Sequence, residues 1–135
     1  MIDRLLRLNN TKIAEGWTIT HDPYPLQAGS FDLAIDLGAE KIIAATKEGQ
    51  KIAIEIKSFL GASQISEFYR ALGQFITYRA ALNKQEPERV LYLAIPNDTY
   101  EKFFLVNFIR DLIAQNQMNL IVYDIDKEII EQWTT

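Results

Sequence analysis

The 135-residue sequence contains no cysteine and a single histidine, and both features narrow the chemistry open to it. Without cysteine there is no disulfide, no thiolate metal site and no cysteine nucleophile, which suits a reducing cytoplasm. No apolar run approaches the roughly 20 residues that a membrane helix needs, and the charged beginning of the chain is unlike a secretory signal. A glycine-rich phosphate loop and a Ser-His-Asp pattern are lacking too. We therefore expect a cytoplasmic protein without membrane contact.

Positive charge is also scarce. The 14 Lys and Arg residues are outnumbered by 18 Asp and Glu residues, which gives a net charge of −4. Proteins that bind DNA by themselves usually present a basic surface, because contacts with phosphate supply most of the affinity. We therefore expect the isolated chain to bind DNA weakly. Any nucleic-acid role must depend on a local patch, a metal ion or a more basic partner.

What is present has the balance of a globular protein, with 48% hydrophobic and 24% charged residues. No repeat or linker interrupts the chain, so we predict one domain over residues 1–135. Hydrophobic periodicity predicts helices over 2–15, 64–83 and 98–117, the second capped by Ser63. It predicts strands over 17–20, 31–37, 41–46, 51–58, 90–95, 120–123 and 128–133. This order predicts an α/β fold in which a mixed β-sheet is sandwiched by helices.

The pattern Glu-x-Lys in the strand over 51–58 is the main candidate for chemistry. Alternate residues of a strand share a face, so Glu55 and Lys57 are neighbours. Asp36 lies at the end of the strand predicted over 31–37, and 18 residues separate it from Glu55. Asp36 and Glu55 could hold Mg²⁺ or Mn²⁺, and Lys57 could orient a water or offset charge on a phosphate. Asp32 shares the face of Asp36, and spacing does not exclude it as the upstream ligand. We expect Asp36, Glu55 and Lys57 to converge in one partly open cleft, although most Glu-x-Lys patterns are merely solvated.

Several segments resemble signature segments of the XisH family, namely residues 17–23, 36–41, 54–59, 71–75, 89–96 and 121–124. That family is named for a factor that controls excision of the fdxN element, a developmental genome rearrangement in cyanobacteria. It is grouped with restriction-endonuclease-like folds, also written PD-(D/E)xK. The resemblance implies that Asp36, Glu55 and Lys57 match the nuclease triad. It also implies DNA and a partner excision factor or recombinase as interaction partners.

Gln74 and Tyr78 have the spacing of a second motif. Gln-x-x-x-Tyr after Glu-x-Lys resembles a helix motif of RecB-type nucleases, whose glutamine lies near the metal site. By that resemblance Gln74 is a fourth candidate catalytic residue. Gln74 falls on the side of its helix opposite the expected apolar stripe. Either that side meets the active site, or Gln74 is exposed.

The expected apolar stripe of this helix also contains a charged residue, Arg79. We expect Arg79 to form a buried ion pair or a subunit contact. The apolar members of the stripe are Ile65, Phe68, Tyr69, Leu72, Phe75, Ile76 and Leu82.

The other candidates have ordinary structural interpretations. We expect His21 to form a hydrogen bond in a proline-rich loop, and Asp124 and Asp126 to serve a turn. Aromatic residues of the helix over 98–117 are expected in the core rather than as a platform for bases. These residues are Tyr100, Phe103, Phe104 and Phe108.

Two functional hypotheses follow. The first is a metal-dependent DNA endonuclease that acts during a rearrangement. The second is a non-catalytic regulatory subunit that keeps the nuclease fold and binds a partner protein or a second copy of itself. The acidic net charge favours the second hypothesis. The complete set of Asp36, Glu55 and Lys57 favours the first, because unpaired charges in a covered sheet cost stability.

Overall fold

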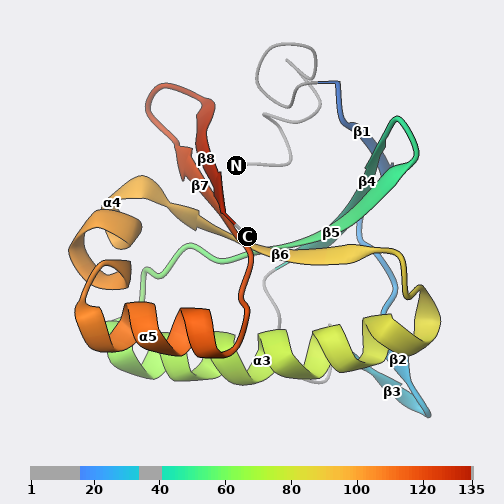
Figure 1. Ribbon diagram of the computed structural model, residues 1–135, viewed down its shortest axis with the longest axis horizontal. Helices are drawn as coiled ribbons and strands as arrows, with labels where there is room; N and C mark the ends of the chain where they lie inside the picture. The colour runs from blue at the N-terminus through green and yellow to red at the C-terminus, as the bar shows by residue number, and fades with distance from the viewer. Residues whose placement is uncertain (1–15, 34–40, 135) are drawn as a thin grey trace.

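A six-stranded mixed sheet forms the centre of the fold (Figure 1), in a computed structural model that describes residues 16–33 and 41–134. In spatial order its strands are β1 (Thr18–His21), β4 (Lys41–Lys47), β5 (Gln50–Ile56), β6 (Val90–Pro96), β7 (Leu120–Asp124) and β8 (Ile129–Thr134). Strands β5, β6 and β7 are parallel, whereas β1, β4 and β8 are antiparallel to their neighbours. The prediction of an α/β fold with a mixed sheet is confirmed.

A tight hairpin joins β4 to β5, which correspond to the strands predicted over 41–46 and 51–58. Its two turn residues, Glu48 and Gly49, have φ angles of 50° and 84°. Positive φ at both positions is the geometry of a type I′ turn, whose twist matches that of the flanking strands. The turn fixes the register of the pair, in which Ile42 of β4 lies opposite Glu55 of β5.

Helix α3 (Gln64–Gln85) follows β5 and returns the chain so that β6 can pair parallel to β5. It begins at the predicted cap, where the Ser63 hydroxyl accepts a hydrogen bond from the backbone N–H of Ser66 at 3.3 Å. That bond satisfies one of the N–H groups that have no partner in the first turn. Strand β6 is the predicted apolar run, and it is buried as expected of a strand in parallel pairing beneath helices.

The helix predicted over 98–117 is broken. Its parts are α4 (Asn97–Thr99), a π-helix η1 (Tyr100–Phe104) and α5 (Asn107–Gln115). Val106 between η1 and α5 has an extended backbone, with ψ at 131°. In a continuous helix Phe104 and Ile109 would point about 140° apart. The break lets both enter one core, where they are 1% and 2% exposed. Burial of both side chains therefore overrides the local preference for one long helix.

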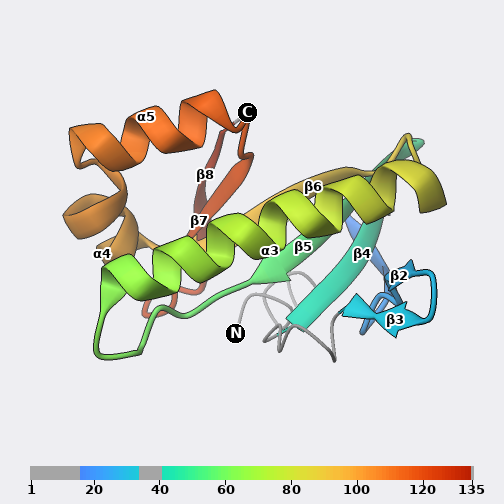
Figure 2. The same cartoon turned by 90° about the horizontal axis from the view of Figure 1, so that it is seen from below.

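The helices that the structure describes cover one face of the sheet (Figure 2). That face and the helices enclose a core that includes Ala53, Phe68, Phe75 and Leu93. The opposite face has its own core, which includes Ile43, Ile54 and Ile121, with Trp17 stacked on Trp133 at a ring-centroid distance of 5.9 Å. The expected helix over 2–15 lies outside the described residues. No helix in the described ranges is long and apolar enough to span a membrane.

Two short strands form a separate sheet, β2 (Gln27–Ala28) with β3 (Phe31–Asp32). The strand predicted over 31–37 is therefore confirmed only for its first two residues. Residues 34–40, which include Asp36, lie outside the described residues. The loop between β1 and β2 contains a cis peptide bond between Asp22 and Pro23.

Candidate functional site

Strand β5 directs Glu55 toward α3. The residues paired with Glu55 on either side are Ile42 of β4 and Leu93 of β6, and both belong to the core beneath the helices. Cross-strand partners share a face of the sheet, so the Glu55 side chain projects into the same layer. The exposed fraction of Glu55 is 0% and that of Lys57 is 7%. The predicted alternation is thus confirmed, but these two side chains are enclosed rather than in a partly open cleft.

Lys57 continues the pairing of β5 with β6 by one residue beyond Ile56, the last residue of β5. Its backbone N–H donates to the carbonyl of Ala94 in β6 at 3.0 Å, which continues the parallel ladder. Its carbonyl accepts from the buried Tyr123 hydroxyl at 3.5 Å. Both contacts hold the backbone of the Glu-x-Lys segment at a fixed depth beneath α3.

Gln74 and Tyr78 of α3 face the sheet. Their exposed fractions are 5% and 0%, so the expectation that Gln74 lies opposite the buried side of the helix is wrong. The buried face is rotated from the predicted stripe, because three members of that stripe, Ile65, Tyr69 and Ile76, are exposed. The residues that do face the core are Phe68, Ala71, Gln74, Phe75, Tyr78, Ala81 and Leu82. This buried face includes Ala71, Ala81, Gln74 and Tyr78, which the predicted apolar stripe did not contain.

Tyr78 and Glu55 interact electrostatically. Burial raises the pKa of the Tyr78 hydroxyl above the usual value for tyrosine, and the Glu55 carboxylate raises it further. A negative charge must lie close to a phenol to oppose its ionisation in this way. The Tyr78 hydroxyl makes no hydrogen bond with any residue that the structure describes. The structure therefore brings together Glu55 and the tyrosine of the Gln-x-x-x-Tyr motif.

The upstream carboxylate of the predicted triad is not tested. Asp36 lies outside the described residues, and the fallback Asp32 belongs to β3 in the small sheet. Within residues 16–33 and 41–134 no three His, Cys, Asp or Glu side chains are grouped closely enough to hold a metal ion. The described part of the site thus supplies one carboxylate, from Glu55, together with the amide of Gln74 and the ammonium of Lys57.

The remaining sequence candidates have structural roles. His21 Nδ1 lies 3.0 Å from the Thr20 hydroxyl, which is the expected loop hydrogen bond. Asp124 accepts from the Lys127 backbone N–H at 3.1 Å in the turn before β8, also as predicted. Arg79 donates to the Gln117 carbonyl at 2.9 Å, which fastens α3 to the end of α5 in place of an ion pair. Phe104 is buried as expected, whereas Phe108 is 61% exposed, so its assignment to the core is wrong.

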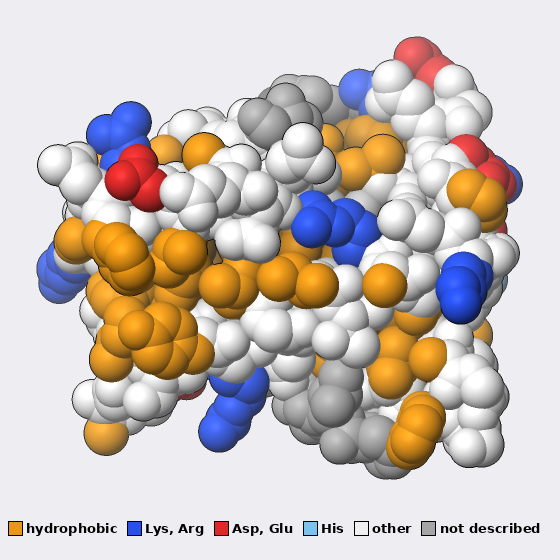
Figure 3. Space-filling view, turned by 60° about the horizontal axis from the view of Figure 1, so that its bottom comes forward, with side chains coloured by type: hydrophobic (Ala, Val, Ile, Leu, Met, Phe, Trp, Pro, Cys, Tyr) orange, Lys and Arg blue, Asp and Glu red, His pale blue; other side chains and the backbone are white. Residues whose placement is uncertain are grey.

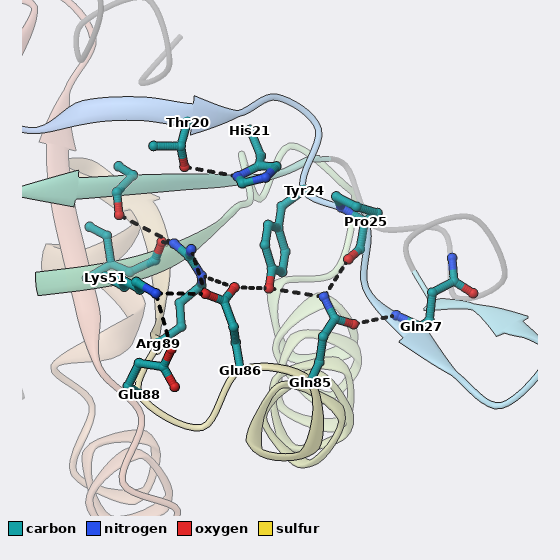
Figure 4. Close-up of polar contacts among 12 residues, drawn as sticks. Thr20, His21, Tyr24, Pro25, Gln27, Lys51, Gln85, Glu86, Glu88 and Arg89 are labelled. Carbon is teal, nitrogen blue, oxygen red and sulfur yellow. Dashed lines mark hydrogen bonds and ion pairs between the residues drawn. The ribbon is translucent and has the colours of Figure 1, made fainter. Parts of the chain in front are cut away.

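A polar network at the C-terminal end of α3 was missed by the sequence analysis (Figure 4). Glu86 accepts from Tyr24 Oη at 2.6 Å and from Arg89 Nε at 2.7 Å. Arg89, whose side chain is 3% exposed, also donates to the Ile52 carbonyl at 2.9 Å. Hydrogen bonds from Arg89 and Tyr24 lower the pKa of Glu86 from 4.5 to about 2. The network ties the helix end, the sheet and the loop before β2 together. Tyr24 and Ile52 lie far in the chain from Glu86 and Arg89, so no sequence spacing signals these contacts.

Comparison with known proteins identifies relatives over nearly the full length of the chain. A family model described as XisH protein matches residues 6–131. The crystal structure of an XisH family protein from Nostoc punctiforme PCC 73102 is 45% identical, with a TM-score of 0.85, and the match covers 99% of this chain and 98% of that one. An fdxN element excision controlling factor protein from Anabaena variabilis is 46% identical, with a TM-score of 0.84 and the same coverage. No curated protein matches significantly.

Proposed function

The chain belongs to the XisH family, and from this premise we propose that it controls the excision of a DNA element by metal-dependent hydrolysis at a restriction-endonuclease-like site. The observation that carries the proposal is the placement of Glu55 and Lys57, side by side on one face of the sheet beneath α3, whose buried side carries Gln74 and Tyr78. A structural carboxylate has little reason to be enclosed together with a lysine, an amide and a phenol.

The topology also supports this proposal. Restriction-endonuclease-like proteins carry their acidic residues and lysine on adjacent strands of a mixed sheet, followed by a helix. Here the β4–β5 hairpin carries Glu-x-Lys at its end, and α3 follows directly. In this proposal Asp36 comes from the segment before β4 and completes the triad with Glu55 and Lys57.

The donor atoms fit a hard divalent cation. Glu55 offers carboxylate oxygens and Gln74 an amide oxygen, and the chain has no cysteine to favour a softer metal. Asp36 and Glu55 would hold Mg²⁺ or Mn²⁺, with Gln74 close by. The bound ion would supply activation of water and compensation of the charge on phosphate. Lys57 would orient the attacking water and donate hydrogen bonds to the phosphate oxygens.

Helix α3 carries more positive than negative charge, although the chain as a whole is acidic. It carries three cationic residues, Arg70, Arg79 and Lys84, and one anionic residue, Glu67. This helix also covers the Glu55 face of the sheet, so DNA phosphates attracted to it would approach the proposed site. A few contacts of this kind give weak, salt-dependent binding. We therefore propose DNA as the substrate and a more basic excision factor or recombinase as the partner that holds it.

A regulatory subunit without catalytic activity is the second candidate, and burial favours it. With Glu55 at 0% and Lys57 at 7% exposed, neither side chain reaches DNA unless the segment between β5 and α3 moves. Leu60 in that segment is 86% exposed, a surface that a partner protein could cover. In this second case the site stabilises the fold, and control of excision comes from binding a recombinase.

A plasmid-nicking assay separates the two candidates. The parent protein, Glu55→Gln, Lys57→Gln and Glu48→Gln are incubated with supercoiled DNA and Mg²⁺ or Mn²⁺. Glu48 is the matched control because it is an exposed glutamate at the opposite end of the same hairpin. We expect nicking by the parent and the control, reduced at least about a hundredfold in the other two variants. Two outcomes would favour the regulatory role. In one, all four proteins nick the DNA equally; in the other, the parent nicks it neither alone nor together with a recombinase.

A further inference from the structure

A second concave site lies away from Glu55, where η1 and α5 meet the strands β7 and β8. Its volume is about 410 Å³, within the range of roughly 300–1,000 Å³ that small-molecule sites occupy. Much of the lining is apolar, with Phe104, Ile113, Met118 and Leu120 on its walls. Glu55, Lys57 and Gln74 are not among the described residues that line it, so the cavity is distinct from the part of the proposed site that the structure describes.

Among the described residues that line the cavity, one has a charged side chain. Arg110 of α5 lines it, and its guanidinium forms no hydrogen bond or ion pair with any residue in the described ranges. The neighbouring acidic residue on the helix, Asp111, lies at the next position and points about 100° away. A cation beside an apolar cavity, with no carboxylate partner in the part of the chain that the structure describes, complements an anion that carries an apolar body.

Gln117 at the rim adds an independent observation. Its φ is 51°, the left-handed conformation that glycine or asparagine usually takes after the end of a helix. The conformation is held by two bonds: its N–H donates to the Ala114 carbonyl at 3.2 Å, and its carbonyl accepts from Arg79 at 2.9 Å. Glutamine carries a steric cost here that glycine would avoid, and Gln117 is among the residues that line the cavity. Strain retained at a concave site points to a role in binding.

The opposite wall is η1, and π-helical segments occur frequently at functional sites. Exposed apolar residues flank the entrance, because Leu105 and Val106 are 42% and 50% exposed. In Figure 3 hydrophobic side chains gather at the left of the view, the end at which η1 and the start of α5 lie in Figure 1. The surroundings of the cavity thus favour an amphiphile over a fully polar ligand.

We propose that this cavity binds a small amphiphilic anion, an apolar chain or ring that bears a carboxylate or a phosphate. The apolar body packs against Phe104, Ile113 and Met118. The head group pairs with the Arg110 guanidinium and accepts a hydrogen bond from the Gln117 amide. A guanidinium binds carboxylate and phosphate equally well in geometry, so the two head groups are compared directly in the test below.

The methyl group of Met118 can report on binding of a ligand in the cavity. The sequence contains two methionines, Met1 and Met118, and Met118 lines the cavity. Protein labelled with ¹³C at the methionine methyl groups is titrated with octanoate, octyl phosphate, octanol and octylamine. We expect a saturable shift of the Met118 signal with octanoate, octyl phosphate or both, while the Met1 signal stays in place. Octylamine at the same concentrations should have no effect, and octanol a weaker one. Whichever anion binds more tightly identifies the head group.

Two variants locate the site. Arg110→Gln should weaken anion binding at least about tenfold, because it removes a charge-assisted hydrogen bond. Arg70→Gln, an exposed arginine of α3, is the matched control and should bind as the parent does. Ala114→Trp should fill the cavity and abolish the shift, and Ala114 is exposed enough to accept the larger side chain. Equal shifts with all four amphiphiles, no shift at all, or unchanged binding by Arg110→Gln would overturn the proposal.

Discussion

Tyr78 in the middle of α3 lies over Glu55 at the end of β5, close enough for the carboxylate to raise the pKa of the phenol. The pair joins two motifs that lie 23 residues apart in the sequence and meet only because α3 folds back over the sheet. Both side chains have an exposed fraction of 0%. Because both side chains are buried, their electrostatic interaction is sensitive to any change of charge at either residue.

The first prediction concerns Tyr78→Phe. The hydroxyl is buried and makes no hydrogen bond with the described residues, so its removal loses no such bond and relieves desolvation. We expect the variant to be more stable than the parent by about 1 kcal/mol at pH 7. Urea unfolding of both proteins measures the difference. A variant less stable than the parent would show that the hydroxyl makes a stabilising contact.

The same pair predicts a dependence on alkaline pH. Because the pKa of Tyr78 is raised in the folded state, the unfolded chain loses this proton first as the pH rises. Ionisation of Tyr78 therefore has no effect on stability well below pH 10 and destabilises the fold as the pH rises above it. The parent should lose more unfolding free energy between pH 9 and 11 than Tyr78→Phe does. Parallel losses in the two proteins would contradict the assignment, since Tyr24 and Tyr92 titrate in both.

A second prediction concerns acid stability and Glu86. Its pKa falls to about 2 in the folded protein, so it stabilises the fold above pH 4.5, and this stabilisation is lost as the pH falls toward 2. Glu86→Ala leaves the buried Arg89 without its carboxylate. We expect a loss of about 3 kcal/mol, the low end for a buried pair because the Glu86 side chain is 25% exposed.

The matched control for Glu86 is Glu88→Ala. Glu88 pairs with Lys51 at 3.2 Å on the surface, with 58% of its side chain exposed. Exposed pairs of this kind contribute little to stability, because water and salt screen them. Thermal and urea unfolding between pH 3 and 7 should therefore show a large, pH-dependent effect at Glu86 and a small one at Glu88. Similar effects at the two positions would mean that the network in Figure 4 does not fasten the fold.

Local signals allowed much of the fold to be predicted. The alternation around Glu55, the cap at Ser63 and the apolar run of β6 each act within a few residues, and the corresponding elements are found where expected. The two motifs of the site could be located for the same reason. Whether Asp36 joins them stays a prediction.

The failures share a physical cause, which is that packing between distant segments outweighs local pattern. The buried face of α3 includes Ala71 and Gln74, which do not register as apolar, so the predicted stripe was rotated. The break at Val106 exists because two core side chains must be buried together. The network of Arg89 joins residues from three segments of the chain, and no spacing along the sequence could reveal those long-range contacts.

A third prediction uses Gly73, which lies on the exposed side of α3. A Cβ added there would meet no atom within 4 Å. Glycine inside a helix costs roughly 0.5–1 kcal/mol relative to alanine. Gly73→Ala should therefore raise the free energy of unfolding by about that amount and leave the oligomeric state unchanged. A destabilised variant, or one with altered sedimentation, would show that a partner helix approaches this face closely.

The central claim, a metal site at Glu55, is tested most directly by thermal melts with and without Mg²⁺ or Mn²⁺. An ion that binds only the folded site stabilises it by about 2.7 kcal/mol at a hundredfold excess over its dissociation constant, which corresponds to several degrees. We predict this shift for the parent and for Glu48→Gln, and its loss in Glu55→Gln. Equal shifts in all three proteins, or no shift in the parent, would contradict the metal site and leave the regulatory subunit as the function of this fold.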